Sequence, residues 1–460
     1  MNENFFSIRP KKEKILIHNK SFCVAPWMHL HIINDGRVFP CCLTPLEDEN
    51  SFGNVNEEKL INIINSKKAK QMRRHMLNGI NLPSSCSSCV SKEKYNLDSM
   101  RIGFNDRWLE ETMPLIESTR RDGYITDLKL KYWDFRFSNY CNLACTTCGP
   151  LFSTQWGPDW EKLNSEKEKY SETRLINLEK ATLFWEDIEK NLDYMEKIHF
   201  AGGEPLIMPE HWQILKLLDQ KEKYDISLKY STNCTTLGKE DIFAYWAKFL
   251  YVHLSLSIDA AHEAYNYIRY RGNWEKTFAN LKQIRKSGIV DYWFHPTLSI
   301  LNIFRITELH EVLHNADLMP LEILLTEKQQ LSYNTTLMLK EKKSQFYIEN
   351  ILKHKGYLKY TIETYWIDRF HINTLFTPEY FSITVLPRKL KDQAAEKINK
   401  YGKKLEKETG IPYFGWENII NFMYSEDNSH LYDKFKVEIE KLDKIRKIDI
   451  YKINPELKDA

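Results

Sequence analysis

Three unevenly spaced cysteines are the residues of this chain best suited to chemistry. Cys141, Cys145 and Cys148 form a CxxxCxxC loop after residues 128–137, whose aliphatic and aromatic side chains predict a strand. Such a loop can direct three thiolates to three corners of an iron–sulfur cube, which leaves the fourth iron free to bind something else. Zinc is the alternative, but it normally takes four protein ligands in a closed site. Since no suitably spaced fourth Cys or His follows, the loop favours a cluster.

A second group of cysteines precedes this loop. Cys23 and Cys41 flank two alternating runs joined by an Asn-Asp-Gly turn at 34–36, a pattern that predicts a β-hairpin. The hairpin would bring these two cysteines together although they are distant in the sequence. Cys86 and Cys89 form a CxxC knuckle that can place two thiolates on one metal. The spacing of the four residues suits either a zinc site or an iron–sulfur cluster.

Three later motifs each follow a predicted strand. They are Gly-Gly-Glu-Pro at 202–205, Ser-Thr-Asn at 231–233 and Ser-Ile-Asp at 257–259. Together with the CxxxCxxC loop, and in this order along the chain, they resemble the motifs of the radical S-adenosylmethionine (SAM) superfamily. Each motif is weak alone, but the ordered set is specific.

The resemblance implies an α/β fold built on a partial (β/α)6 radical SAM barrel, with the reactive centre at the carboxyl ends of the strands. Strand patterns that alternate with helical segments independently predict parallel βα units. We predict the fifth strand over 293–302 and the sixth over 371–376, with 321–327 as the alternative. A mostly helical insertion is expected at about 305–365, and helices that cover the site are expected within 151–195.

The predicted domain organisation has three parts. A small N-terminal Cys-rich auxiliary-cluster domain covers 1–125, the radical SAM core covers 126–386, and a helical C-terminal extension covers 387–460. The first part resembles the auxiliary-cluster modules called SPASM and twitch domains, because Cys23, Gly36 and Cys41 fit their opening pattern. Such modules usually follow the core, whereas this one precedes it. Its cysteines suffice for one cluster, as in the shorter twitch form.

These resemblances imply the cofactors and their ligands. The cofactors are a SAM-binding [4Fe–4S] cluster, an auxiliary [4Fe–4S] cluster and S-adenosyl-L-methionine. The implied ligands are Cys141, Cys145 and Cys148 for the first cluster and Cys23, Cys41, Cys86 and Cys89 for the second. Cys42 is the alternative to Cys41, since adjacent residues of a strand point to opposite faces.

The implied SAM contacts come from the strand ends. They are Gly202, Gly203, Glu204, Pro205, Asn233, Ser257 and Arg269. The glycines would let the backbone approach the cofactor, Glu204 would accept hydrogen bonds from its amino group, and the Arg269 guanidinium would match its carboxylate. Asn233 and Ser257 would contact the ribose, for which Ser231 and Asp259 are further candidates. Arg271 is the alternative to Arg269.

The function that the resemblance implies is oxidoreductase-like radical chemistry. A reduced cluster would cleave SAM to a 5′-deoxyadenosyl radical, which abstracts hydrogen from a substrate. Family analogy favours a peptide or protein substrate; a small molecule, such as a nucleotide or cofactor precursor, is the enzymatic alternative. A zinc-stabilised binding protein without enzymatic activity is the third hypothesis. The expected electron donor is a reductant such as flavodoxin or ferredoxin, and the motifs identify no residue that quenches the substrate radical.

Composition limits the partners and the location. The formal net charge of +2, from 65 basic and 63 acidic residues, gives no electrostatic reason to expect nucleic acid or an anionic membrane as a partner. Residues 1–14 lack the apolar core of a secretion signal, and the apolar stretch 243–258 is too short to span a bilayer. The odd number of cysteines, nine, argues against a disulfide framework. We therefore expect a soluble, cytoplasmic protein.

Overall fold

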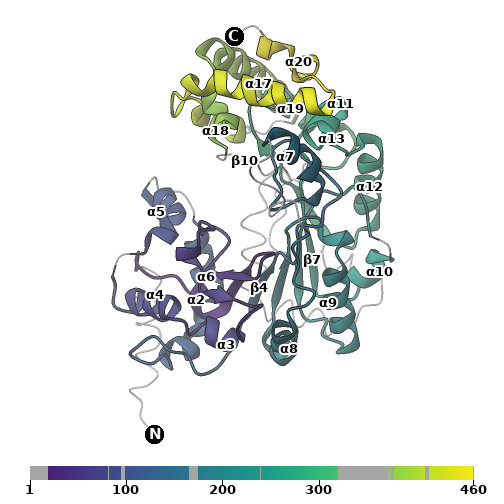
Figure 1. Cartoon of the computed structure of the whole chain (residues 1–460). Helices are drawn as coiled ribbons and strands as arrows, with labels where there is room; N and C mark the ends of the chain where they lie inside the picture. The colour runs from purple at the N-terminus through teal and green to yellow at the C-terminus, as the bar shows by residue number, and fades with distance from the viewer. Residues whose placement is uncertain are drawn as a thin grey trace.

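One sheet of eight strands organises the molecule (Figure 1). The computed structural model describes residues 19–80, 82–94, 99–164, 175–238, 240–319, 370, 372–374, 378–409 and 414–458. The strand order is β3-β2-β1-β4-β5-β6-β7-β8. Their bounds are β1 His29–Ile32, β2 Arg37–Phe39, β3 Gly53–Asn54, β4 Tyr132–Phe135, β5 Lys197–Phe200, β6 Ser227–Thr232, β7 Tyr251–Leu256 and β8 Asp291–Phe294. The α/β fold class with a parallel sheet is confirmed.

The N-terminal segment shares this sheet with the core. β1 and β2 form the predicted antiparallel hairpin, in which His31 pairs with Phe39. β1 also pairs in parallel with β4, with His29 opposite Tyr132 and Ile32 opposite Phe135. The sequence did not indicate this pairing. It means that the hairpin beside the second group of cysteines is hydrogen-bonded to the strand that leads into the CxxxCxxC loop.

The fifth predicted strand is divided at Pro296. β8 ends before this residue and β9, Thr297–Leu298, begins after it, because proline has no N–H to donate to a strand neighbour. β10, Asn373–Thr374, pairs in parallel with β9, and Phe370 forms a parallel bridge with Phe294. The described part of the preferred sixth-strand segment therefore runs beside the fifth strand. The alternative sixth strand, 321–327, lies outside the described residues. The strands that are described form an open sheet and not a closed barrel.

Helices cover the sheet on the side drawn at the right of Figure 1. These are α8 Thr182–Asn191, α9 Pro209–Gln220, α10 Ile242–Trp246 and α12 Trp274–Ser287. Their aromatic side chains pack on every second residue of the strands, and Tyr230, for example, meets Trp246 with ring centroids 5.5 Å apart. On the opposite face, Phe104 of α6 (Met100–Glu117) packs edge-on against Tyr132 at 5.9 Å.

The remaining helices belong to the two ends of the sheet. Near the N-terminus lie α2 Ala25–Met28, α3 Leu60–Ile63, α4 Lys67–Leu77 and α5 Ser87–Lys94. At the carboxyl ends of the strands lie α7 Gly157–Leu163, α11 His262–Ile268 and α13 Ile306–Asn315, with the predicted helical extension α17 Arg388–Thr409, α18 Phe414–Tyr424, α19 Tyr432–Arg446 and α20 Ile450–Ile453 (Figure 1). Among the helices in the described ranges, none has the length and apolarity that a bilayer crossing requires.

Because β1 belongs to the same sheet as the core strands, we expect truncation of a buried β1 side chain to destabilise the whole chain as much as truncation of any core side chain. Leu30 is 1 % exposed, whereas Val437 on α19 is 50 % exposed. We expect Leu30→Ala to lower the free energy of unfolding by about 3 kcal/mol, since truncation of a buried leucine loses transfer energy and leaves a void. Val437→Ala should change it by less than about 0.5 kcal/mol. Urea denaturation measures both, and a loss below about 1 kcal/mol for Leu30→Ala would contradict the packing of β1 in the common core.

Candidate active site

The CxxxCxxC loop follows β4 and is fixed by the end of α11 and the residues just after it. The N–H of Ala144 donates to the carbonyl of Tyr270 at 3.0 Å, and that of Thr146 donates to the carbonyl of Ile268 at 2.7 Å. Cys141 and Cys145 are buried and Cys148 is half-buried. Burial raises the pKa of all three thiols. Thiols in such surroundings are inert unless a metal or cation stabilises the thiolate.

The two glycines at 202–203 let one backbone segment pack directly on another. Gly202 has φ +101°, and a Cβ on Gly203 would stand 2.6 Å from the carbonyl carbon of Tyr140 and closer still to its oxygen. The N–H of Gly203 donates to the carbonyl of Ser138 at 3.1 Å, and that of Glu204 donates to the carbonyl of Tyr140 at 2.9 Å. The observed reason for these glycines is thus contact with the chain just before Cys141. Their predicted contact with SAM stays a prediction.

Glu204 is buried and anchored to the end of β6. Its carboxylate accepts hydrogen bonds from Thr232 Oγ1 at 2.7 Å, from the N–H of Asn233 at 2.7 Å and from the N–H of Leu206 at 3.2 Å. Burial raises the pKa of Glu204 to about 7, although these hydrogen bonds oppose the shift. The neighbouring Pro205 opens a short 3-10 helix, Pro205–Ile207. The side chain is therefore held in place and titrates near neutral pH.

The side chain of Asn233 reaches the cysteine loop from the end of β6. Its Nδ2 donates to Asn142 Oδ1 at 3.1 Å and lies 3.9 Å from Cys141 Sγ. Ser257, at the end of β7, is half-buried, and its N–H donates to the carbonyl of Thr232 at 2.8 Å. Of the two predicted ribose contacts, Asn233 thus touches the loop through its side chain, and Ser257 lies at the adjacent strand end.

Arg269 forms a buried ion pair with Asp259 beside Cys145. Arg269 Nε lies 2.7 Å from Asp259 Oδ2, and its Nη1 lies 3.7 Å from Cys145 Sγ. Burial disfavours the charge, but Asp259 and Cys145 outweigh it and raise the pKa of Arg269. The alternative, Arg271, is exposed and contacts Gln155. Arg269 therefore remains the candidate for a carboxylate partner, and Asp259 is its counterion.

Arg446, which lies in α19 far along the chain, was not predicted from the sequence as a residue of the site. Arg446 Nε donates to Asp159 Oδ2 at 2.9 Å, and Nη1 donates to Thr146 Oγ1 at 3.1 Å. The guanidinium lies between the rings of Trp156 at 4.6 Å and Tyr270 at 4.3 Å. No local pattern around Arg446 distinguishes it from the other basic residues of this charged helix. Only the fold shows that the C-terminal extension contacts the cysteine loop.

The second group of cysteines shares one cavity. Cys23, Cys41, Cys86 and Cys89 line it together with apolar side chains such as Leu82 and Phe104. Cys42 is not among the lining residues; its Sγ lies 3.8 Å from Met100 Sδ. The structure therefore groups Cys41, and not Cys42, with the other three thiols. Within the described ranges, no three His, Cys, Asp or Glu side chains converge on the position of a single metal ion.

The donor chemistry of both groups fits iron–sulfur clusters. Each group offers thiols alone, three in the loop and four around the cavity, and thiolates are the ligands that hold such clusters. All nine cysteines of the sequence are free of disulfides.

Protein-family models match two segments of the chain. The model described as the radical SAM superfamily matches residues 135–317, and the model described as SPASM, an iron–sulfur cluster-binding domain, matches residues 23–90. The chain therefore contains a radical SAM domain, and an iron–sulfur cluster-binding domain precedes it. Its cofactors are SAM, the [4Fe–4S] cluster of the radical SAM domain and auxiliary iron–sulfur clusters bound by the SPASM domain. The predicted family, domain order and cofactors are confirmed.

Solved structures show distant likeness. The structure of anSMEcpe with bound AdoMet and Cp18Cys peptide is 17% identical over 41% of this chain and 48% of its own, with a TM-score of 0.30. The structure of Streptococcus suis SuiB bound to precursor peptide SuiA is 12% identical over 84% of this chain and 70% of its own, with a TM-score of 0.31. The chain thus spans about half the length of the former. No curated protein matches the sequence.

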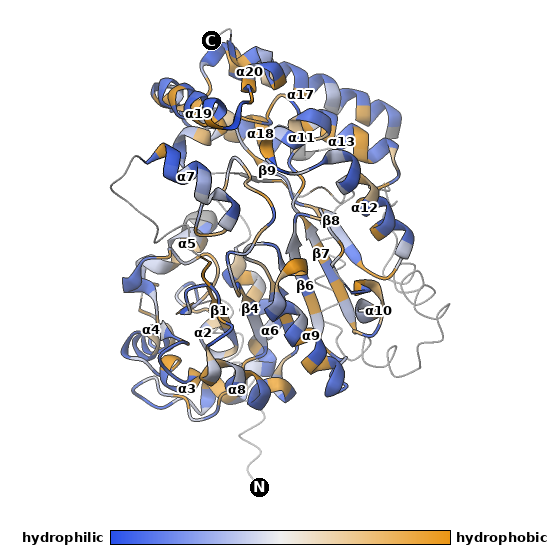
Figure 2. Ribbon diagram, turned by 45° about the vertical axis from the view of Figure 1, so that its right-hand side comes forward, coloured by the Kyte–Doolittle hydropathy of each residue, from blue (hydrophilic) through white to orange (hydrophobic). Residues whose placement is uncertain are grey.

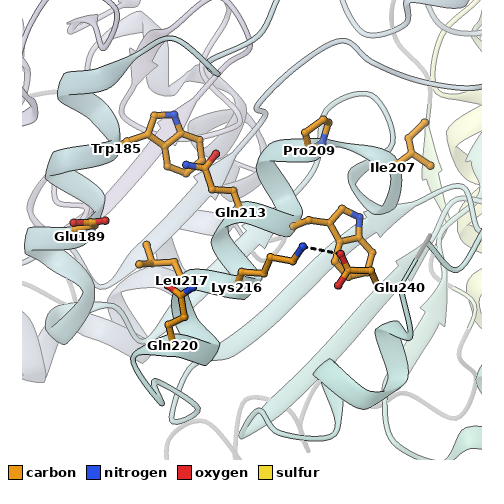
Figure 3. A pocket seen from close by; sticks show the side chains of 10 residues that line it. Trp185, Glu189, Ile207, Pro209, Gln213, Lys216, Leu217, Gln220 and Glu240 are labelled. Carbon is orange, nitrogen blue, oxygen red and sulfur yellow. Dashed lines mark ion pairs between the residues drawn. The ribbon is translucent and has the colours of Figure 1, made fainter.

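A separate pocket of about 590 Å³ lies on the outer helical face, between α8 and α9 (Figure 3). Trp185 and Trp212 are among the residues that line it, and Lys216 pairs with Glu240 at 2.7 Å on one side. None of the predicted ligands or SAM contacts lines this pocket, so we do not assign it to the active site.

The backbone contact at Gly203 predicts a large effect of a single methyl group. Gly203→Ala should lower the free energy of unfolding by about 2–3 kcal/mol, because the new Cβ meets backbone atoms of Tyr140 that cannot rotate away. Gly149→Ala, after the same loop, is the control, since no atom lies within 4 Å of its Cβ position. Urea denaturation of both variants measures the difference. Equal stabilities would contradict the close packing of the two segments.

The buried pair of Arg446 and Asp159 predicts a second stability effect. The Arg446 side chain is 0% exposed and that of Asp159 is 8% exposed. Arg446→Met should cost about 3 kcal/mol, because it leaves a buried carboxylate without its partner. The double variant with Asp159→Asn should recover part of this loss, as a double-mutant cycle of unfolding free energies would show. Strictly additive losses would mean that the two side chains do not interact.

Proposed function

We propose that this enzyme abstracts hydrogen from a peptide or protein substrate after reductive cleavage of SAM. The observation that carries the proposal is the convergence of two strand ends, those of β5 and β6, and of the end of helix α11 on one cysteine loop. Gly203 packs on the chain before Cys141, Asn233 lies beside Cys141 Sγ, and Arg269 lies beside Cys145 Sγ. The bound cluster and SAM supply the electron transfer and the radical chemistry, which amino acid side chains cannot provide.

The proposed roles of the residues follow from their contacts. Cys141, Cys145 and Cys148 hold the cluster that binds SAM. Arg269, kept charged by Asp259, binds the carboxylate of SAM. Glu204 accepts hydrogen bonds from the amino group of SAM. The resulting approach of an ammonium group would favour the ionised form of Glu204, whose pKa burial raises to about 7. Gly202, Pro205, Asn233 and Ser257 remain the proposed neighbours of the rest of the cofactor.

The proposed auxiliary ligands are Cys23, Cys41, Cys86 and Cys89. Their common cavity supports Cys41 over Cys42. A zinc ion held by the same four thiols is the alternative for this group alone. Metal analysis distinguishes the two, since a protein with two four-iron clusters contains about eight iron atoms per chain and one with a single cluster about four.

The pairing of domains supports the proposed substrate class. A radical SAM domain joined to a SPASM module supports a peptide or protein substrate by the family analogy given above, and a small molecule is the second candidate. We also propose a cytoplasmic location, which the nine free cysteines support, a reductant such as flavodoxin or ferredoxin, and no nucleic acid or membrane partner.

Substitutions in the two cysteine groups should have different effects on SAM cleavage and on iron content. Cys145→Ala should abolish 5′-deoxyadenosine formation, because it removes a ligand of the cluster that binds SAM. Cys89→Ala should leave SAM cleavage measurable but reduce the iron content from about eight to about four atoms per chain. The measurements are iron counting and deoxyadenosine quantification after anaerobic reconstitution with a reductant.

Cys42→Ala is the matched control, because Cys42 lies outside the shared cavity. It should keep the iron content of the parent protein. Full cleavage by Cys145→Ala would overturn the assignment of the first cluster, and loss of iron in Cys42→Ala would overturn the choice of Cys41. Zinc in place of half of the iron would favour the structural alternative for the N-terminal group.

A further inference from the structure

One row of ionisable side chains crosses the middle of the sheet. The register of the parallel strands β1 and β4–β8 places these residues side by side: His31, Asp134, His199, Lys229, His253 and Asp291. Alternate residues of a strand share one face, so all six face away from the helices that pack on residues such as Tyr230. Figure 2 shows apolar and polar residues alternating along β7. This is unusual, because parallel sheets are normally apolar on both faces.

The two carboxylates of the row already have partners within it. Asp134 lies between two imidazoles, with His31 Nδ1 at 3.2 Å and His199 Nδ1 at 3.3 Å. Asp291 Oδ2 lies 3.0 Å from His253 Nδ1. Burial opposes ionisation of Asp134, but His199 and His31 outweigh it and hold its pKa well below the ordinary value. Asp134 is thus a buried, ionised carboxylate.

The cations on the same face form no ion pair with a described residue. Lys229 lies over the ring of Trp293 at 5.1 Å, and Lys197 lies over the ring of Tyr132 at 4.7 Å. Arg136 directly follows β4 and acts on His199 of the same face, as Lys229 does. All three side chains are half-buried. Burial lowers the pKa of Lys229, and the Asp134 carboxylate opposes that shift only in part, so a bound anion would favour the charged form of Lys229.

Lys229 and Arg136 act on the same neighbours. Burial lowers the pKa of His199 to about 4, and both cations add to that lowering. Both also counteract, in part, the rise that burial causes in the pKa of Cys42. Burial and the charge of Lys229 lower the pKa of Lys197 to about 7. Lys229 and Arg136 therefore both lie close to His199.

This face leads directly to the cysteine loop. Lys229, Ser231 and Asn233 follow one another on the same side of β6 and its continuation, and Asn233 Nδ2 lies 3.9 Å from Cys141 Sγ. Four residues of strand span about 13 Å. A group held at Lys229 would therefore leave the adjoining part of an extended molecule near the loop. His199 Nε2, within hydrogen-bond distance of Ser231 Oγ at 3.0 Å, lines the same path.

We propose that Lys229 and Arg136 bind a carboxylate of the substrate, so that the substrate is an acidic peptide with an Asp or Glu side chain held on this face. The proposal rests on the proposed function, since it takes the substrate to be a peptide. A guanidinium and an ammonium on one face recognise a carboxylate through charge-assisted hydrogen bonds.

The test uses the full chain, reconstituted anaerobically with iron and SAM, and a library of eight-residue peptides with blocked ends. Peptides retained by the protein are sequenced by mass spectrometry. We expect Asp or Glu to be enriched about tenfold at one position, which corresponds to one charge-assisted hydrogen bond. The double variant Lys229→Met with Arg136→Gln should lose this enrichment, and Lys229→Arg should keep it.

Lys282→Met is the matched control. Lys282 also lies over an aromatic ring, that of Phe278 at 4.4 Å, but it is exposed on α12, so the variant should keep the enrichment. Absence of acidic enrichment with the parent protein, or its persistence in the double variant, overturns the proposal. So does tighter binding of inorganic phosphate than of the acidic peptides, which would indicate a small phosphorylated substrate. Deoxyadenosine formation by the same sample tests the proposed function separately, and its presence without acidic enrichment would overturn this inference alone.

Discussion

Direct packing of one backbone segment on another fixes the active site. Residues 202–204 pack against residues 138–140 and form two hydrogen bonds with them. The two segments are so close that no side chain fits at position 203. This contact joins the end of β5 to the end of β4, from which the cysteine loop departs. Since Glu204 is in turn bonded to the end of β6, the positions of three strand ends are coupled. The thiols are held by the parallel sheet and not by the loop alone.

Buried charges are arranged around this loop in pairs. Arg269 with Asp259 lies beside Cys145, and Arg446 with Asp159 lies behind Thr146. Each pair places a cation near thiols that would carry negative charge as metal ligands, and each carboxylate limits the cost of burying that cation. One cation comes from the segment after β7 and the other from the C-terminal extension. The extension is therefore part of the site as well as a cover over the strand ends.

The two faces of the sheet differ in what they can bind. The outer face packs against α8, α9, α10 and α12, and the inner face carries the row of ionisable residues that includes Asp134 and Lys229. Apolar residues such as Phe135 and Tyr230 pack against the outer helices, which accounts for the stability of the sheet. The inner face instead carries ionisable groups in register, and only some of them form an ion pair with another described residue. A surface of this kind gains little from burial against the protein itself. Its chemistry suits a polar partner that reaches the cysteine loop along the strands.

The sequence by itself determined those features that depend on residues close to one another in the chain. The thiol spacing, the Gly-Gly-Glu-Pro motif, the hairpin turn at 34–36 and the alternation within strands each depend on residues a few positions apart, and they sufficed for the fold class, the family and the cofactors. The parallel pairing of β1 with β4 was not predictable, because strand partners distant in the chain are chosen by tertiary packing.

Only the tertiary structure grouped Cys41 with Cys23, Cys86 and Cys89, because which side of the chain a residue faces depends on the local backbone and on what packs against it. Only it brought Arg446 to Thr146, which lies 300 residues away in the sequence. The inner row was visible as alternation along each strand, but its alignment into one surface required the register between strands. Register depends on hydrogen bonds between distant segments, and no single segment encodes it.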